Sequence, residues 1–164
     1  MQEATPETTA GPLAAIRERM AAAAKMARRA PEDIHLIAVS KTRAAEDIEP
    51  LIHEGQMRFG ENRVQEAATK WPALKQRHPG VQLHLIGQLQ SNKADEAVAL
   101  FDMIHSVDRL SLATALGKAM EKQARYIPCF IQVNIGAEEQ KGGCAVSELP
   151  ALIAAAKDSG VPLA

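Results

Sequence analysis

Short runs of apolar residues alternate along the chain with longer segments in which apolar positions recur every three or four residues. The short runs are typical of buried strands, and the longer recurrence is typical of amphipathic helices. Five strands are predicted, at residues 35–40, 57–60, 81–86, 102–107 and 128–135, with a sixth beginning at 161–163. Helices are predicted between them, at residues 44–53, 63–71, 93–100, 110–125 and 147–157.

The beginning of the chain lies outside this alternation. Residues 1–12 contain Thr, Pro, Gly and Glu without a hydrophobic period, so we expect a flexible tail. Residues 13–29 carry apolar side chains at helical spacing, and Pro31 ends that segment. We therefore expect an additional N-terminal helix, within one α/β domain that covers residues 13–164.

The alternation of strand and helix defines the fold class. It predicts parallel strands joined by right-handed crossovers, either as an open doubly wound sheet or as a closed (β/α)₈ barrel. Eight units of about 25 residues would need roughly 200 residues, the lower end of the usual barrel size. The chain has 164 residues. The pattern is therefore compatible with a small open sheet or with an incomplete barrel from a longer polypeptide.

Composition excludes several classes of function. Hydrophobic residues make up 46% of the chain, which excludes wholesale disorder. Nineteen basic and twenty acidic residues give a net charge of -1, so charge indicates neither a nucleic-acid partner nor a membrane partner. Two cysteines and no signal-peptide pattern predict a cytoplasmic protein. No cluster of His, Asp or Glu has the spacing of a metal site.

Polar residues follow the apolar part of all five predicted strands. The junctions are Ser40-Lys41-Thr42, Glu61-Asn62, residues 87–93, residues 105–108 and Gln132-Val133-Asn134. Parallel α/β folds bind their ligands at this edge. Taken singly, Asn62, Ser91 and Asp108 would also suit helix N-caps. Because amide, amine and hydroxyl groups recur at five junctions, we favour a shared pocket.

Lys41 is the residue with the most distinctive chemistry. Alternation places it on the same face of its strand as Ile37 and Val39. At the rim of a partly dry cavity, close to a cation such as Arg43, its amine would more readily be neutral and could attack an aldehyde. The alternative is a lysine that reaches solvent from a strand end.

Five co-linear segments resemble the pyridoxal phosphate (PLP) homeostasis proteins, which are PLP-binding proteins with a fold like the N-terminal barrel of alanine racemase. The segments are residues 37–42, 59–66, 84–93, 104–108 and 131–135. The resemblance implies a (β/α)₈ barrel of which this chain carries about five βα units and the start of strand six. The C-terminal third, about 70 residues, would then lie outside this chain.

The resemblance also implies a cofactor site. Lys41 matches the lysine that holds PLP as an internal aldimine, and four further residues match positions around the cofactor: Asn62, His84, Ser106 and Asn134. No catalytic residue is implied, because members of the family are regarded as carriers or regulators of PLP supply and not as turnover enzymes. PLP-dependent apo-enzymes would be their partners.

Two other functions stay open at this stage. A PLP-dependent enzyme such as a racemase would need a second acid or base opposite the lysine, commonly a tyrosine. Tyr126, the only tyrosine, precedes the fifth predicted strand and so lies at the opposite edge. A protein-interaction module could instead use the helix at 110–125 to pass PLP to apo-enzymes.

Overall fold

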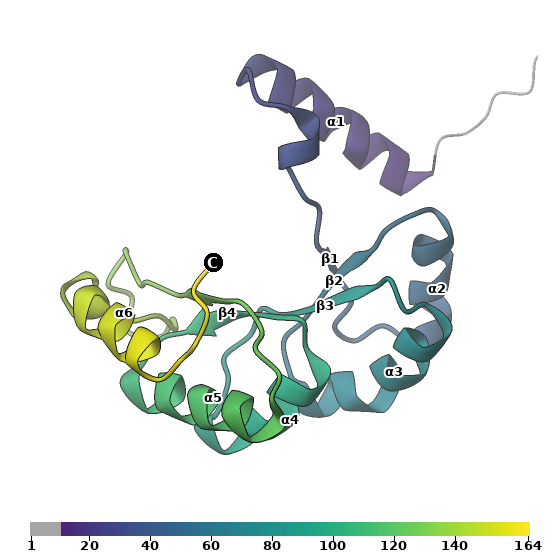
Figure 1. Cartoon of the computed structure of the whole chain (residues 1–164). Helices are drawn as coiled ribbons and strands as arrows, with labels where there is room; N and C mark the ends of the chain where they lie inside the picture. Colours follow the sequence, from purple (N-terminus) through teal and green to yellow (C-terminus); the bar gives the residue numbers. More distant parts are fainter. Residues whose placement is uncertain (1–10) are drawn as a thin grey trace, which may run out of the picture. The chain divides into compact units, whose positions relative to one another are not determined.

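The computed structural model describes residues 11–164, which divide into a unit that ends at Leu36 and a unit from Ile37 to Ala164 (Figure 1). The first unit contains the additional helix α1 (Pro12–Met26) and the 3₁₀ turn η1 (Pro31–Asp33). The predicted tail lies outside the described residues except at its end, where α1 already begins at Pro12. A proline suits this first turn because its missing N–H would have no helical partner there. That both units form one domain stays a prediction.

The second unit alternates strand and helix as predicted. Its strands are β1 (Ala38–Val39), β2 (Arg58–Glu61), β3 (Gln82–Leu85), β4 (Met103–Val107) and β5 (Cys129–Ile131). Its helices are α2 (Ala45–His53), α3 (Val64–Arg77), α4 (Ala94–Leu100), α5 (Leu110–Gln123) and α6 (Leu149–Asp158), and the 3₁₀ turns η2 (Ser91–Lys93) and η3 (Val146–Glu148) precede α4 and α6.

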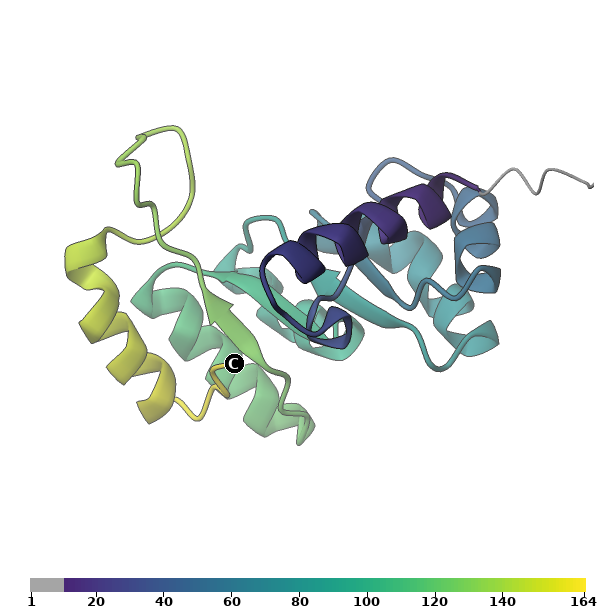
Figure 2. The same ribbon diagram turned by 90° about the horizontal axis from the view of Figure 1, so that it is seen from above.

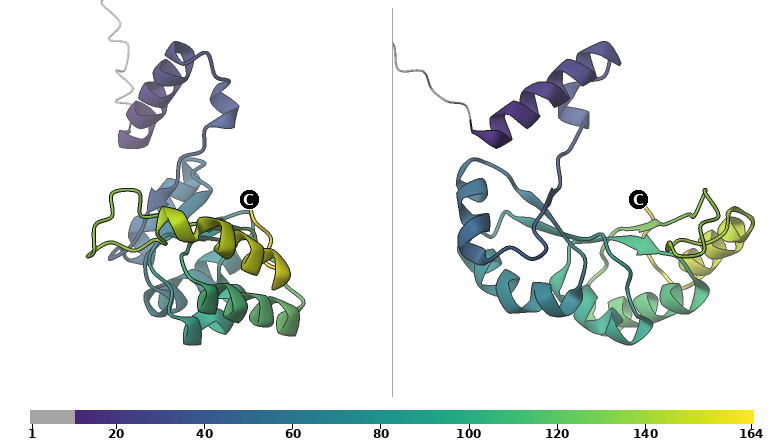
Figure 3. Two further views of the ribbon diagram at one scale, coloured as in Figure 1. Left: turned by 90° about the vertical axis from the view of Figure 1, so that its left-hand side faces the viewer. Right: turned by 180° about the vertical axis from the view of Figure 1, so that it is seen from behind.

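The strand order decides between the two folds that the sequence left open. All strands pair in parallel, in the order β1-β2-β3-β4-β5, and Leu163 adds a parallel bridge to Cys129 where the sixth strand was predicted to begin. Figures 1 and 3 show helices α2–α6 in one curved row on the same side of this sheet. A doubly wound sheet would reverse its strand order and carry helices on both faces. The unit is therefore the first part of a (β/α)₈-type barrel.

The hydrophobic core lies between the sheet and this row of helices. Alternate strand residues point into it and are fully buried, among them Phe59, Leu83 and Ile104. The Trp71 ring of α3 packs against Phe59 with centroids 5.2 Å apart. Burying side chains of this size stabilises the fold by about 1.5–3 kcal/mol each. Because these residues must face the helices, the residues between them in each strand face the opposite side of the sheet.

The opposite face, which we call the inner face, is set by register. Gly60 pairs with Val39 on one side and with His84 on the other. A Cβ atom at Gly60 would lie 3.0 Å from the side chain of Ile86 and 3.1 Å from that of Ile37. Val39, Gly60 and His84, which are neighbours across the three strands, therefore point away from the helices, as residues that line a barrel interior do.

The strands predicted at residues 35–40 and 128–135 are shorter in the structure, and the predicted end of the second helix in the alternation is wrong for a clear reason. The helix from residue 63 was expected to end at Trp71 because Pro72 follows, but α3 continues to Arg77 with Pro72 inside it. Trp71 and Leu74, on either side of the proline, are both fully buried. Their packing offsets a cost of about 3 kcal/mol for an interior proline.

Candidate functional site

The chain leaves β1 in a tight turn that carries Lys41. The Arg43 N–H donates to the Ser40 carbonyl over 3.1 Å, so Lys41 and Thr42 are the central residues of a four-residue turn. Thr42 has a φ of 61°, a left-handed conformation that is rare for a β-branched residue. Lys41 is exposed, and its amine has no hydrogen bond or ion pair with any residue that the structure describes.

A buried carboxylate lies beside this turn, on the helix side of the sheet. Glu61, the last residue of β2, is fully buried. Its Oε1 atom accepts hydrogen bonds from Ser40 Oγ over 2.6 Å and from Trp71 Nε1 over 3.0 Å, and it pairs with Lys70 Nζ at 2.9 Å. The sequence pattern places Glu61 in the polar junction after the second predicted strand but does not identify its buried partner Lys70. A buried carboxylate requires such a partner.

The end of β2 is held against the end of β3 by direct backbone contact. Asn62 follows β2 and is half-buried, and its side-chain amide has no hydrogen bond with the described residues. A Cβ atom at Gly87 would lie 2.2 Å from the Asn62 carbonyl oxygen. Only glycine fits there, which explains the glycine that follows the third predicted strand.

Two histidines pair across β3 and β4. His84 Nδ1 lies 2.8 Å from His105 Nε2, and the His105 ring is followed by that of Phe130 at a centroid distance of 5.0 Å. Burial first, and then the neighbouring His105, lower the pKa of His84 to about 4. Burial also lowers the pKa of His105. The pair is therefore neutral near pH 7, while the buried His84 Nε2 atom has no partner among the described residues.

Ser106 and Asn134 differ in how their polar groups are used. Ser106 in β4 is fully buried, and its Oγ atom has no partner among the described residues. Asn134 is bound to its own loop: its Nδ2 donates to the Glu138 carbonyl over 2.8 Å, and its Oδ1 accepts from the Glu138 N–H over 3.2 Å. Asn134 thus holds the loop after β5, which extends from the end of that strand in Figure 2.

The helix-capping alternative is wrong for the three residues that suggested it. The N-cap residues are Arg63 for α3, Lys93 for α4 and Arg109 for α5, and none of them makes a side-chain cap hydrogen bond. Asp108 instead accepts from Arg109 Nη1 over 2.7 Å and from the Gly143 N–H over 3.4 Å. The Arg109 Nη2 atom donates to the Leu89 carbonyl over 2.6 Å, so this pair joins the loops after β3, β4 and β5.

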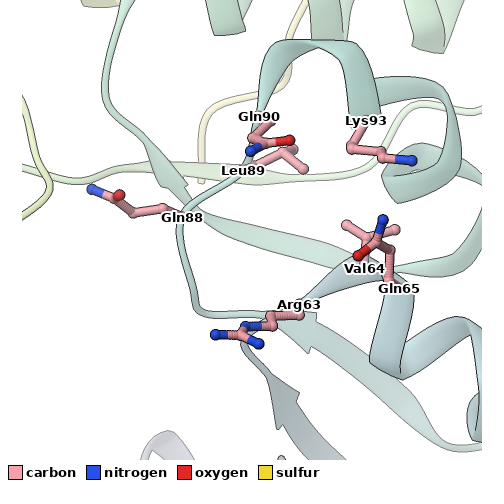
Figure 4. A pocket seen from close by; sticks show the side chains of 7 residues that line it. All are labelled: Arg63, Val64, Gln65, Gln88, Leu89, Gln90 and Lys93. Carbon is pink, nitrogen blue, oxygen red and sulfur yellow. The ribbon is translucent and has the colours of Figure 1, made fainter.

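A polar pocket of about 290 Å³ lies at the same edge, between the loops after β2 and β3. Figure 4 shows its lining residues, Arg63, Val64, Gln65, Gln88, Leu89, Gln90 and Lys93. The Arg63 guanidinium and the Lys93 amine point to opposite sides of the view and do not converge on one position. Lys41 does not line this pocket, so we separate it from the lysine site.

The predicted residues thus take distinct places in the sheet. Lys41, Asn62 and Asn134 lie just beyond β1, β2 and β5, whereas His84 and Ser106 lie within β3 and β4. Within residues 11–164, no cluster of three or more His, Cys, Asp or Glu side chains could hold a metal ion. Among the same residues, no helix combines the length and the apolar character that a membrane span needs.

A parallel sheet wound in sequence order, with helices along one face and an unpaired amine at its carboxyl edge, defines a protein of the (β/α)₈ barrel class with its ligand site at the strand ends. The chain belongs to the family described as alanine racemase, N-terminal domain, whose model matches residues 12–163. This confirms the barrel fold that the sequence resemblance implied.

Named relatives support the resemblance to the PLP homeostasis proteins. The chain is 41% identical over 144 residues to the pyridoxal phosphate homeostasis protein of Escherichia coli K12, covering 87% of this chain and 62% of the relative. Identity to the protein of that name from Pseudomonas aeruginosa is 37% over 150 residues, covering 92% and 64%. The chain therefore spans less than two thirds of the length of these relatives.

A solved structure of PipY from Synechococcus elongatus PCC7942, with PLP bound, matches with a TM-score of 0.67 and 40% identity over 84% of this chain and 63% of PipY. The structure of PipY without PLP matches with a TM-score of 0.69 and the same identity. These findings confirm the predicted resemblance to the PLP homeostasis proteins.

The histidine pair predicts a pH dependence of stability. Because the pKa of His84 is about 4 in the folded chain and about 6.5 in an unfolded chain, the unfolded state binds more protons between these values. The contribution of His84 to the free energy of unfolding is complete above pH 6.5 and is lost, by up to about 3 kcal/mol, as the pH falls to 4.

Denaturant unfolding at a series of pH values checks this prediction. The H84Q variant should lose less stability than the wild type between pH 6.5 and pH 4. H35Q, at an exposed histidine, is the matched control and should follow the wild type. Equal pH slopes for the wild type and H84Q would contradict the assignment.

Proposed function

We propose that this chain binds PLP covalently through Lys41 and takes part in PLP homeostasis as a carrier without turnover. The observation that carries the proposal is the unpaired amine of Lys41, held in a defined turn at the carboxyl edge of a barrel sheet. The relatives named PLP homeostasis protein and the PLP-bound PipY support it.

The residues present fit such a ligand. The His84 Nε2 and Ser106 Oγ atoms are buried without a partner among the described residues. An unsatisfied buried polar group costs about 1–3 kcal/mol, so a polar ligand that reached either atom would relieve that cost. The amide of Asn62 adds an unused donor and acceptor beside the turn.

When bound, PLP supplies an aldehyde carbon that a neutral primary amine attacks, with formation of a carbon–nitrogen double bond and release of one water. In this chain Lys41 provides the amine. The neutral His84–His105 pair offers hydrogen bonds and no positive charge near pH 7. Asn134 and Asp108 hold the loop after β5 in place at the same edge.

The absence of turnover and the identity of the recipients are parts of the same proposal. Two-base racemisation needs a second proton donor or acceptor opposite the lysine. Tyr126 is 58% exposed and lies in the segment before β5, at the amino edge of the sheet. It is therefore badly placed for that role. PLP-dependent apo-enzymes are the proposed recipients of the cofactor.

Borohydride trapping tests the role of Lys41. The full chain is incubated with PLP, reduced, digested and analysed by mass spectrometry. In the wild type, we expect the label on the peptide that contains Lys41. K41M should lose at least nine tenths of the total label, because no other amine is held unpaired at the end of β1.

The matched control is K122M, because Lys122 is an exposed lysine on the helical surface, where it forms an ion pair with Asp95. It should keep the label at the wild-type level. A K41M variant that is folded by circular dichroism and is labelled as strongly as the wild type would refute the proposal.

Chiral chromatography tests the absence of turnover. The PLP-loaded chain is incubated with several L-amino acids, and the D-enantiomers are measured over time against free PLP. We expect the two rates to agree within experimental error. Formation of a D-enantiomer that K41M abolishes would show a racemase instead.

A further inference from the structure

We propose that Lys70 is the positioning residue for Lys41: its ammonium fixes the turn at residues 40–43 and thereby the place of the Lys41 amine. The proposal rests on the function proposed for Lys41, although the structure of the turn can be tested without PLP. Lys70 lies in the second turn of α3 and makes no hydrogen bond or ion pair with Lys41.

The contacts of Lys70 enclose the turn from both ends. Its Nζ atom donates to the carbonyl of Ser40 over 2.8 Å and to the carbonyl of Arg43 over 2.9 Å. These are the first and last residues of the turn, so one ammonium ties together the two backbone groups that bracket Lys41 and Thr42. Both carbonyls point toward α3 as a result.

Two carboxylates hold the ammonium in place. Lys70 Nζ lies 2.9 Å from Oε1 of Glu61 and 3.0 Å from Oε1 of Glu66, and the Lys70 side chain is only 10% exposed. A cation with so little solvent needs opposite charges and hydrogen bonds in good geometry. Because the two carboxylates are this close, they also offset the positive charge of Lys70. Lys70 therefore acts on Lys41 by fixing the conformation of the turn and not by its charge.

The second central residue of the turn makes this support necessary. Thr42 has a φ of 61°, at a position where turns of this kind favour glycine. Its N–H donates to Oε1 of Glu66, the atom that also binds Lys70. The pKa of Glu66 is lowered first by this backbone N–H and then by Lys70, which agrees with a carboxylate held at the centre of the contact.

The consequence for Lys41 follows from these contacts. Without the ammonium, the Ser40 and Arg43 carbonyls lose a shared donor, and Glu61 and Glu66 lose their counterion. Thr42 is then free to return to a negative φ, which changes the direction of the chain at Lys41. Replacing Thr42 by glycine removes the steric reason for that change, because glycine tolerates the left-handed conformation.

The experiment compares K70M, K70M/T42G and T42G with the wild type by borohydride trapping at a PLP concentration below saturation. K70M should trap PLP on the Lys41 peptide at least fivefold less than the wild type. The T42G change should restore K70M to within twofold, and T42G alone should resemble the wild type.

The matched control is K75M. Lys75 lies on the same helix and also binds a carboxylate and a carbonyl, those of Asp102 and Leu100, but at the amino edge of the sheet. K75M should therefore lose stability without losing trapping. Equal losses in K70M and K75M, or wild-type trapping in K70M, would overturn the proposal. A loss of trapping in K70M that T42G does not restore, but that a higher pH does restore, would also overturn the proposal. That pattern would indicate that Lys70 acts on Lys41 through its charge.

A second readout uses no PLP. Trypsin cleaves after Lys41 and after Arg43, and the turn must open for cleavage. K70M should be cut at these two bonds at least fivefold faster than K75M, as followed by mass spectrometry. If the wild type fails to trap PLP but K70M is cut faster in this way, the function of Lys41 is refuted and the positioning role stands. Equal cleavage rates refute the positioning role itself.

Discussion

A carboxylate inside the layer between the sheet and its helices sets the constraint from which the site follows. Glu61 has no contact with solvent, and a buried charge is tolerated only with a close counterion and further hydrogen bonds. Lys70, Ser40 and Trp71 supply them. These groups come from the end of β1 and from α3. The ion pair therefore joins β1, β2 and α3 at the carboxyl edge and leaves the Lys41 amine unpaired beside them among the described residues.

The two edges of the sheet divide their roles as barrel proteins generally do. At the amino edge, Asp102 accepts hydrogen bonds from Lys75, Arg125 and the Leu83 N–H, and it ties three elements together for stability. At the carboxyl edge, the buried network around Glu61 makes no hydrogen bond with the side chains of Lys41 and Asn62. The buried His84 Nε2 and Ser106 Oγ atoms, which have no partner among the described residues, lie in the neighbouring strands β3 and β4. These unused polar groups support the proposed site for a polar ligand.

Local pattern predicted the strands and the helices and marked the polar residues at the strand ends, because strand ends in a parallel fold are recognisable from sequence. The roles of the candidate residues, and His84 as a candidate, came from the family resemblance. Local pattern failed where contacts between residues far apart in the sequence determine the structure. Packing of Trp71 and Leu74 carries α3 past Pro72, and the Lys70 contacts with residues 40–43 join positions that no local spacing relates. Glu61 at the end of β2, and the i,i+4 pair of Glu66 and Lys70, were the available signals. Asn134 was identified as a candidate, but its bonds within its own loop were visible only in the structure.

Amide hydrogen exchange at Thr42, measured by NMR in the wild-type chain without PLP, tests whether Lys70 and Glu66 hold the turn at residues 40–43 closed. Thr42 is exposed to solvent, so an amide in a loose turn would exchange near the rate of an unstructured peptide. The Lys70 and Glu66 contacts predict exchange at least about tenfold slower, because the turn must open first. Exchange of the Thr42 amide at the unstructured rate would contradict the account.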